Sequence, residues 1–143
     1  MPAHPFSLTA AVLATAIASA AAAQPPSIAI PLDTSVAIPG GEAACTGIGQ
    51  TRDDPRWAAY PVRVEVSDAK NQYLADATIV VKDAKGRPII QASCAGPWLL
   101  LKLAPGAYSA FAQLSNSPAR PRSAPFHTPS KGQLRVVLQF PDA

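Results

Sequence analysis

Residues 73–111 read YLADATIVVKDAKGRPIIQASCAGPWLLLKLAPGAYSAF, and this stretch decides the fold. Residues 77–82, ATIVVK, are dominated by β-branched side chains, which favour a strand. Residues 83–86, DAKG, break the run with turn residues, because Asp suits the first position of a turn and Gly tolerates a positive φ near its end. Residues 87–93 then form the return strand. The sequence therefore predicts a β-hairpin.

Two more strands follow in the same stretch. Residues 98–103, WLLLKL, are apolar on both faces, which indicates a strand that is covered on both sides. A turn at residues 104–106 leads into a strand over residues 107–115. Tyr108 comes just after that turn, at a position that suits a tyrosine corner, in which the hydroxyl bonds back to the upstream backbone. The alternative is that Tyr108 is a plain core aromatic.

Strand patterns also lie on both sides of this stretch. Residues 61–67 and 133–140 alternate apolar and polar side chains, as half-buried strands do. Residues 115–131 contain four prolines, so we expect an edge strand or a loop there, because proline cannot donate to a central ladder. The count is about seven strands. The fold class is therefore all-β, a single antiparallel sandwich.

Four short motifs carry a family resemblance, and they specify turns: Gly47-Ile48-Gly49, Tyr73-Leu74-Ala75-Asp76, Gly96-Pro97-Trp98 and Leu103-Ala104-Pro105-Gly106-Ala107-Tyr108. Over Cys45 to Phe140 the chain resembles the carboxypeptidase regulatory-like domain, in particular the free-standing type of proteobacterial periplasmic proteins. The resemblance implies a prealbumin-like or Ig-like antiparallel β-sandwich with an accessory role and no catalytic residues. Ala107 stands where the family often has a basic residue.

The N-terminus has the pattern of a secretory signal peptide. Residues 5–23 carry no charge and end in Ala21-Ala22-Ala23, so we expect a signal helix within residues 1–23 that is cleaved after Ala23. The segment before the apolar run departs from this pattern, because it has His4 and no Lys or Arg. An uncleaved membrane anchor is the alternative. Cleavage would leave a periplasmic or secreted protein with no stable membrane anchor.

The cleaved chain divides into two parts. We expect residues 24–44 to form an extended N-terminal arm, with short edge strands at 28–30 and 36–38 as the alternative. Residues 45–143 would form the carboxypeptidase regulatory-like domain. Near its start, Thr51 or Asp54 could cap a short helix.

The two cysteines, Cys45 and Cys94, are expected to form a disulfide, which is the default for an exported protein. A metal-binding or catalytic thiol would need partners, and the chain has no Cys-x-x-Cys motif. His127 is the single histidine after the signal segment, whereas zinc needs several ligands. The adjacent Asp53 and Asp54 lack the further ligands that calcium requires. We therefore expect no metal and no cofactor.

Composition and motifs argue against several function classes. The net charge of +3 is spread along the chain, which argues against nucleic-acid binding. No Gly-x-Ser-x-Gly nucleophile motif occurs, so we expect that the protein is not an enzyme. The transthyretin-like fold does include a hydroxyisourate hydrolase that ends in Tyr-Arg-Gly-Ser. This chain ends with residues 138–143, LQFPDA, and does not fit that enzyme.

Two binding functions remain. The first is a non-catalytic module for an unidentified protein or envelope component, with a contact surface built by residues 46–60 and the Gly-Pro-Trp corner. Arg56, Trp57 and Trp98 are its expected anchors, because such residues dominate interfaces; the alternative is that both tryptophans fill the core. The second function is a carbohydrate- or small-ligand-binding sandwich that uses solvent-facing aromatic rings as a stacking platform, with these candidates: Trp57, Tyr60, Tyr73 or Trp98.

Overall fold

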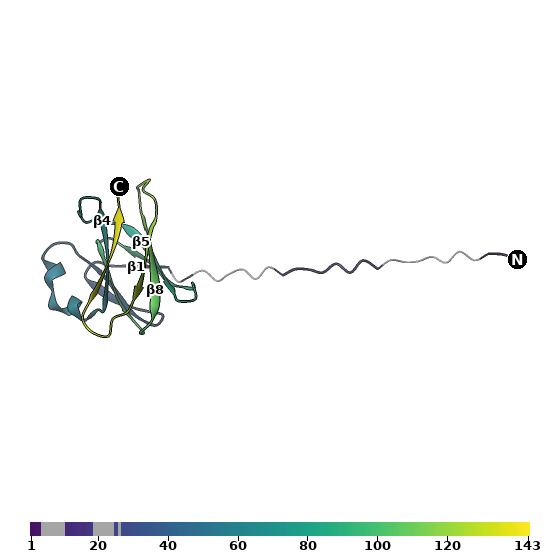
Figure 1. The fold of residues 1–143 in the computed structure, drawn as a ribbon, viewed down its shortest axis with the longest axis horizontal. Coiled ribbons are helices and arrows are strands. Elements are labelled where there is room, and N and C mark those ends of the chain that lie inside the picture. Colours follow the sequence, from purple (N-terminus) through teal and green to yellow (C-terminus); the bar gives the residue numbers. More distant parts are fainter. Residues whose placement is uncertain (4–10, 19–24, 26) are drawn as a thin grey trace.

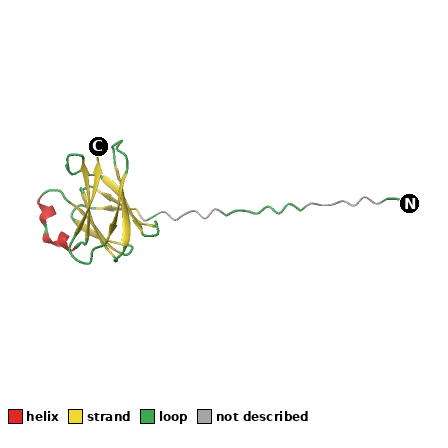
Figure 2. Cartoon of the chain, viewed as in Figure 1, coloured by secondary structure: helices red, strands yellow, loops and turns green. Residues whose placement is uncertain are grey.

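Two five-stranded sheets face each other in the computed structural model, which describes residues 1–3, 11–18, 25 and 27–143 (Figures 1 and 2). The expected all-β sandwich is confirmed. Residues 1–3 and 11–18 contain no helix, and the rest of the expected signal segment lies outside the described residues. No helix in the described part of the chain is long and apolar enough to cross a membrane.

Each sheet has its own set of strands. Sheet A has, from edge to edge, β1 (Ser27–Ile30), β6 (Pro88–Cys94), β5 (Ala77–Asp83), β8 (Ala107–Leu114) and β9 (Arg122–His127). Sheet B has β10 (Leu134–Phe140), β4 (Val62–Asp68), β7 (Trp98–Leu103), β3 (Gly41–Thr46) and β2 (Thr34–Ile38). Two short 3₁₀ helices, η1 (Gln50–Asp53) and η2 (Pro55–Ala59), connect β3 to β4.

The sequence predicted fewer strands than the structure has, and it predicted that all of them run antiparallel. The described residues form ten strands, and two neighbouring pairs, β1 with β6 and β10 with β4, run parallel. The three additional strands are β1 to β3, which lie in the segment expected as an arm or directly at its end. Each parallel pair joins segments far apart in the sequence, so no local turn signals its direction.

The segment expected as an extended N-terminal arm belongs to the sandwich, and the alternative of short edge strands at 28–30 and 36–38 is the one that the structure bears out. β1 and β2 are edge strands of sheets A and B, and β3 lies between β2 and β7. Ile30, Ile38 and Ala43 from this segment are buried in the core between the sheets. The prolines of this segment misled the prediction, because Pro31 and Pro39 flank the strands and do not interrupt them. The sandwich therefore begins near Ser27, well before Cys45.

The predicted hairpin is confirmed as β5 and β6. Ala77, Ile79 and Val81 are buried on the inner face of β5. In the turn, the Asp83 carboxylate accepts hydrogen bonds from the backbone N–H groups of Lys85 and Arg87, both at 2.9 Å. The N–H of Arg87 is the main reason that the pKa of Asp83 is lowered. Gly86 takes the positive φ of 75° that the turn requires.

The predicted disulfide between Cys45 and Cys94 is confirmed. Cys45 near the end of β3 and Cys94 at the end of β6 have Cα atoms 5.6 Å apart. Both residues are buried in the main core. The bond therefore links sheet B to sheet A through the interior.

The predicted tyrosine corner is also confirmed. The hydroxyl of Tyr108 donates to the carbonyl oxygen of Ala104 at 2.7 Å, and its ring stacks on Phe126 with centroids 5.7 Å apart. β9, which carries Pro125, is an edge strand of sheet A, as its proline content predicted.

Replacing Tyr108 by phenylalanine should lower the free energy of unfolding by about 1 kcal/mol, because the ring stacking stays and only one hydrogen bond is lost. Urea denaturation of the wild type and of Tyr108→Phe measures this difference. Equal stability of the two proteins would show that the hydroxyl does not hold the corner, and that Tyr108 is a packing residue alone.

Candidate functional site

The connection from β3 to β4 covers part of the outer face of sheet B (Figure 2). Trp57 and Tyr60 pack there against Ala44 and Leu100 and form a small apolar cluster outside the main core. The indole N–H of Trp57 donates to the carbonyl oxygen of Thr51 at 2.8 Å. Only 3% of Trp57 is exposed. The connection between β3 and β4 is therefore packed against sheet B through Trp57 and Tyr60.

The start of η2 forms as the sequence predicted. The Asp54 carboxylate accepts a hydrogen bond of 2.9 Å from the backbone N–H of Arg56, and Pro55 is the first residue of the helix. Of the two expected caps, Asp54 is the one used. The helix is a short 3₁₀ helix of five residues, in which Trp57 is buried against the sheet and Arg56 faces solvent.

The Gly-Pro-Trp corner contacts this connection closely. A Cβ atom on Gly47 would lie 2.8 Å from Cγ of Pro97 and 2.9 Å from Cγ of Trp98, so only glycine fits. Gly47 also has a positive φ of 107°. The two parts of the predicted surface are therefore adjacent, and the Gly-Ile-Gly motif begins where they touch.

The tryptophans of the predicted surface are not exposed anchors. Trp57 is 3% exposed and Trp98 is 7% exposed, so the expectation that they present their rings to a partner is wrong. Trp57 covers the apolar outer face formed by Ala44 of β3 and Leu100 of β7. Trp98 lies on β7 itself and is covered by the Arg63 guanidinium and the Tyr73 ring. Of the three expected anchors, Arg56 alone is exposed, with 53% of its side chain accessible.

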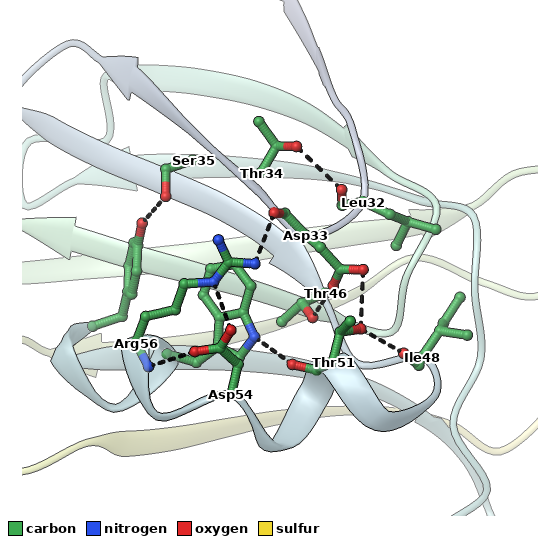
Figure 3. A network of polar contacts seen from close by, with 11 residues as sticks. Leu32, Asp33, Thr34, Ser35, Thr46, Ile48, Thr51, Asp54 and Arg56 are labelled. Carbon is green, nitrogen blue, oxygen red and sulfur yellow. Dashed lines mark hydrogen bonds and ion pairs between the residues drawn. The ribbon is translucent and has the colours of Figure 1, made fainter.

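Asp33 is the residue that holds this region together, and sequence reasoning missed it. Its carboxylate accepts hydrogen bonds from the hydroxyls of Thr46 at 2.6 Å and Thr51 at 2.9 Å (Figure 3). Its carbonyl oxygen accepts from Nη2 of Arg56 at 3.1 Å, and its N–H donates to the carbonyl oxygen of Cys45 at 2.7 Å. Asp33 has a φ of 58°, a conformation that Asp adopts more readily than most residues.

Three exposed side chains surround Asp33, and we call them the Asp33 surface: Leu32, Ile48 and Arg56. Leu32 is 39% exposed and Ile48 is 48% exposed. The Arg56 guanidinium lies 4.2 Å from the centroid of the Trp57 ring, and its Nε is 3.2 Å from the Asp54 carboxylate. Figure 3 shows how these side chains project from one network of polar contacts. The Asp33 surface thus combines two apolar side chains with one oriented cation.

A second polar contact fixes the end of the connection to sheet B. The hydroxyl of Tyr60 donates to the carboxylate of Glu42 and lies 2.5 Å from Oγ of Ser35. The hydrogen bond from Tyr60 is the main cause of the lowered pKa of Glu42, while burial raises the pKa of Tyr60. Lys102 lies over the Tyr60 ring, with its Nζ 4.7 Å from the centroid.

A buried carboxylate lies further along the outer face of sheet B. Glu65 is 1% exposed, and its two oxygens accept from Nε and Nη2 of Arg135 at 3.1 and 2.5 Å. Nε of Arg63 is 2.9 Å from the same carboxylate, and the Arg63 guanidinium stacks on Trp98 at 4.2 Å. The hydrogen bond to Glu65 raises the pKa of Arg135. The buried Glu65 carboxylate is therefore paired with the guanidinium groups of Arg63 and Arg135.

The sequence signal for this cluster was indirect. Residues 63, 65 and 67 were expected to form the polar face of β4, yet Glu65 and Ser67 are buried. Arg135, which binds Glu65, lies 70 residues away in sequence, on the strand paired with β4. The sequence shows opposite charges in β4 and β10, but it does not show that these two strands pair in parallel and bring the charges together.

The remaining residues of functional interest are scattered. His127 is exposed at the end of β9. Within the described residues, no three His, Cys, Asp or Glu side chains are placed to hold a metal ion. Of the proposed aromatic row, Trp57, Tyr60 and Trp98 are buried, and only Tyr73 is exposed. Its edge contacts the Trp98 ring with centroids 5.8 Å apart, so the four rings form no continuous exposed platform.

No protein-family model matches the chain, and a search of curated proteins also finds no match. The resemblance to the carboxypeptidase regulatory-like domain therefore stays a prediction.

Proposed function

We propose that this protein is an exported, non-catalytic module that binds a protein or another envelope component through the Asp33 surface. The observation that carries the proposal is the network of hydrogen bonds from Thr46, Thr51 and Arg56 to Asp33. This network fixes the backbone next to Leu32 and Ile48 and orients the Arg56 side chain. A surface that is already ordered loses little conformational freedom on binding, which favours affinity. Function on a connection that is held by a rigid sandwich is common.

The composition of the Asp33 surface suits a protein partner. Leu32 and Ile48 supply exposed apolar area, and Arg56 is of a residue type enriched in protein interfaces. The guanidinium is oriented by the Trp57 ring and the Asp54 carboxylate. A partner with an apolar side chain next to a carboxylate would match this arrangement, because the carboxylate could replace water at the exposed side of Arg56.

Export is part of the proposal. The buried bond between Cys45 and Cys94 supports it, since disulfides persist in oxidising compartments such as the periplasm or the extracellular space. Removal of residues 1–23 as a signal peptide would leave a chain that starts just before β1. We also propose that the domain belongs to the carboxypeptidase regulatory-like type, a proposal that the all-β sandwich and the Tyr108 corner support.

The alternative, a carbohydrate-binding sandwich, has less support. Such a function needs aromatic rings with accessible faces. Trp57, Tyr60 and Trp98 are buried, and the exposed Tyr73 stands alone among the four rings that were considered. The arrangement of the aromatic rings therefore favours a protein or envelope partner.

A photoreactive amino acid at position 48 should test the proposed surface in intact cells. Cross-linking from position 48 is expected to capture one defined partner, because Ile48 projects from the Asp33 surface. The matched control is position 85, which is exposed in the β5–β6 turn. Equal cross-linking from both positions, or none from position 48, would contradict the proposal.

A further inference from the structure

The strand β10 differs from the other three edge strands of the sandwich. β1 has 4 residues, β2 has 5, and β9 contains Pro125 within its length. Short strands and prolines are common means of keeping sheet edges from pairing with other chains. β10 has 7 residues, LRVVLQF, and none of them is proline. It is one of the two edge strands of sheet B in the described chain, shown as the yellow arrow near the C-terminus in Figure 1.

The register of β10 defines which of its backbone groups are free. The N–H of Leu134 donates to the carbonyl oxygen of Pro61 at 2.8 Å, so Leu134 faces the neighbouring strand β4. Backbone groups alternate along a strand, and the N–H and C=O of one residue point to the same side. Arg135, Val137 and Gln139 therefore direct their N–H and C=O groups to the open edge.

The side chains of β10 also form a self-complementary pattern about Val137. In an antiparallel pair centred on Val137, Arg135 of one copy lies opposite Gln139 of the other, and Val136 lies opposite Leu138. Leu134 then lies opposite Phe140 on the same inner face. Apolar side chains thus meet apolar side chains, and the single charge meets an amide. A pair centred on Arg135 would instead place two guanidinium groups opposite each other, which is destabilising.

We propose that β10 is a homodimer interface, at which a second copy of this chain pairs antiparallel with β10 about Val137. In this register, Arg135, Val137 and Gln139 pair all their free backbone groups with the same three residues of the second copy. The two B sheets join into one continuous sheet across a twofold axis. The axis also brings together the two Val137 side chains, which are 45% exposed in the single chain.

Replacement of Val137 by proline tests this interface. The N–H of Val137 faces the open edge, so Val137→Pro removes a dimer hydrogen bond from each copy and leaves the pairing with β4 in place. The matched control is Ser123→Pro on β9. Pro125 cannot donate to its partner strand, and Ser123 lies two residues earlier, so its N–H also faces outward. Sedimentation equilibrium over a concentration series of the disulfide-bonded protein measures the mass.

The wild type and Ser123→Pro are expected to show twice the monomer mass at high concentration. Val137→Pro should raise the dimer Kd at least tenfold, and Val137→Lys provides a second variant, because it places two like charges opposite each other. A monomer at every concentration, or a dimer that neither Val137 variant weakens, would overturn the proposal.

Hydrogen exchange of the wild type gives an independent readout of the register. The amides of Arg135, Val137 and Gln139 should exchange more slowly as the protein concentration rises, because dimer pairing protects them. The outward amide of Ser123 should exchange at the same rate at every concentration. Protection that does not depend on concentration at positions 135, 137 and 139 would contradict pairing between copies.

Discussion

Replacing both Cys45 and Cys94 by alanine is expected to lower the free energy of unfolding by about 4 kcal/mol. The two cysteines are separated by 49 residues, and closing a loop of this length restricts the unfolded chain by roughly that amount in the chain-entropy model. The bond joins the two sheets through the core, so its loss also removes the one covalent link between β3 and β6. For a domain of this size the loss is a large fraction of the total stability.

Urea denaturation with and without a reductant measures the effect of the disulfide. Reduction should destabilise the wild type and leave the variant without cysteines unchanged. An oxidised wild type no more stable than this variant would show that packing alone holds the sheets together.

Replacing Trp57 by alanine is expected to cost about 3–5 kcal/mol of stability, because a buried aromatic side chain is lost. Trp57 covers Ala44 and Leu100 on sheet B, and its indole N–H is hydrogen-bonded to Thr51. Trp57→Phe is the matched variant. It keeps most of the apolar cover, loses the hydrogen bond and should cost less than half as much.

Thermal and urea denaturation of the two Trp57 variants show whether Trp57 is a buried residue that stabilises the fold or an exposed residue that binds a partner. A stable Trp57→Ala variant that fails to bind the partner would contradict the buried position and restore the original expectation of an exposed anchor.

The sequence predicted best the features that local chemistry determines. The β5–β6 hairpin, the Tyr108 corner and the capping Asp54 each depend on residues within a few positions of one another, so turn preferences are sufficient. The disulfide was predictable because the chain has two cysteines and one possible pair.

The features that the sequence did not predict depend on distant neighbours. β1, considered only as an alternative to an arm, gains stability by pairing with β6, which lies far along the chain. Asp33 is part of the site because the β3–β4 connection folds back over it. The burial of Trp57 depends on an apolar patch from β3 and β7, which no local pattern around Trp57 reveals.

The central claim, that the Asp33 surface binds a partner, is tested most directly by comparing two arginine variants. Arg56 and Arg87 are both exposed and both paired with an aspartate, at 3.2 and 3.0 Å. Arg87 follows the β5–β6 turn, at the opposite end of β6 from Cys94.

Capture of the cross-linked partner from envelope extract is measured for each variant, together with its melting temperature. The account predicts that Arg56→Ala reduces capture at least tenfold and keeps a melting temperature close to that of the wild type, while Arg87→Ala captures normally. Normal capture by Arg56→Ala, or equal loss in both variants, would contradict it.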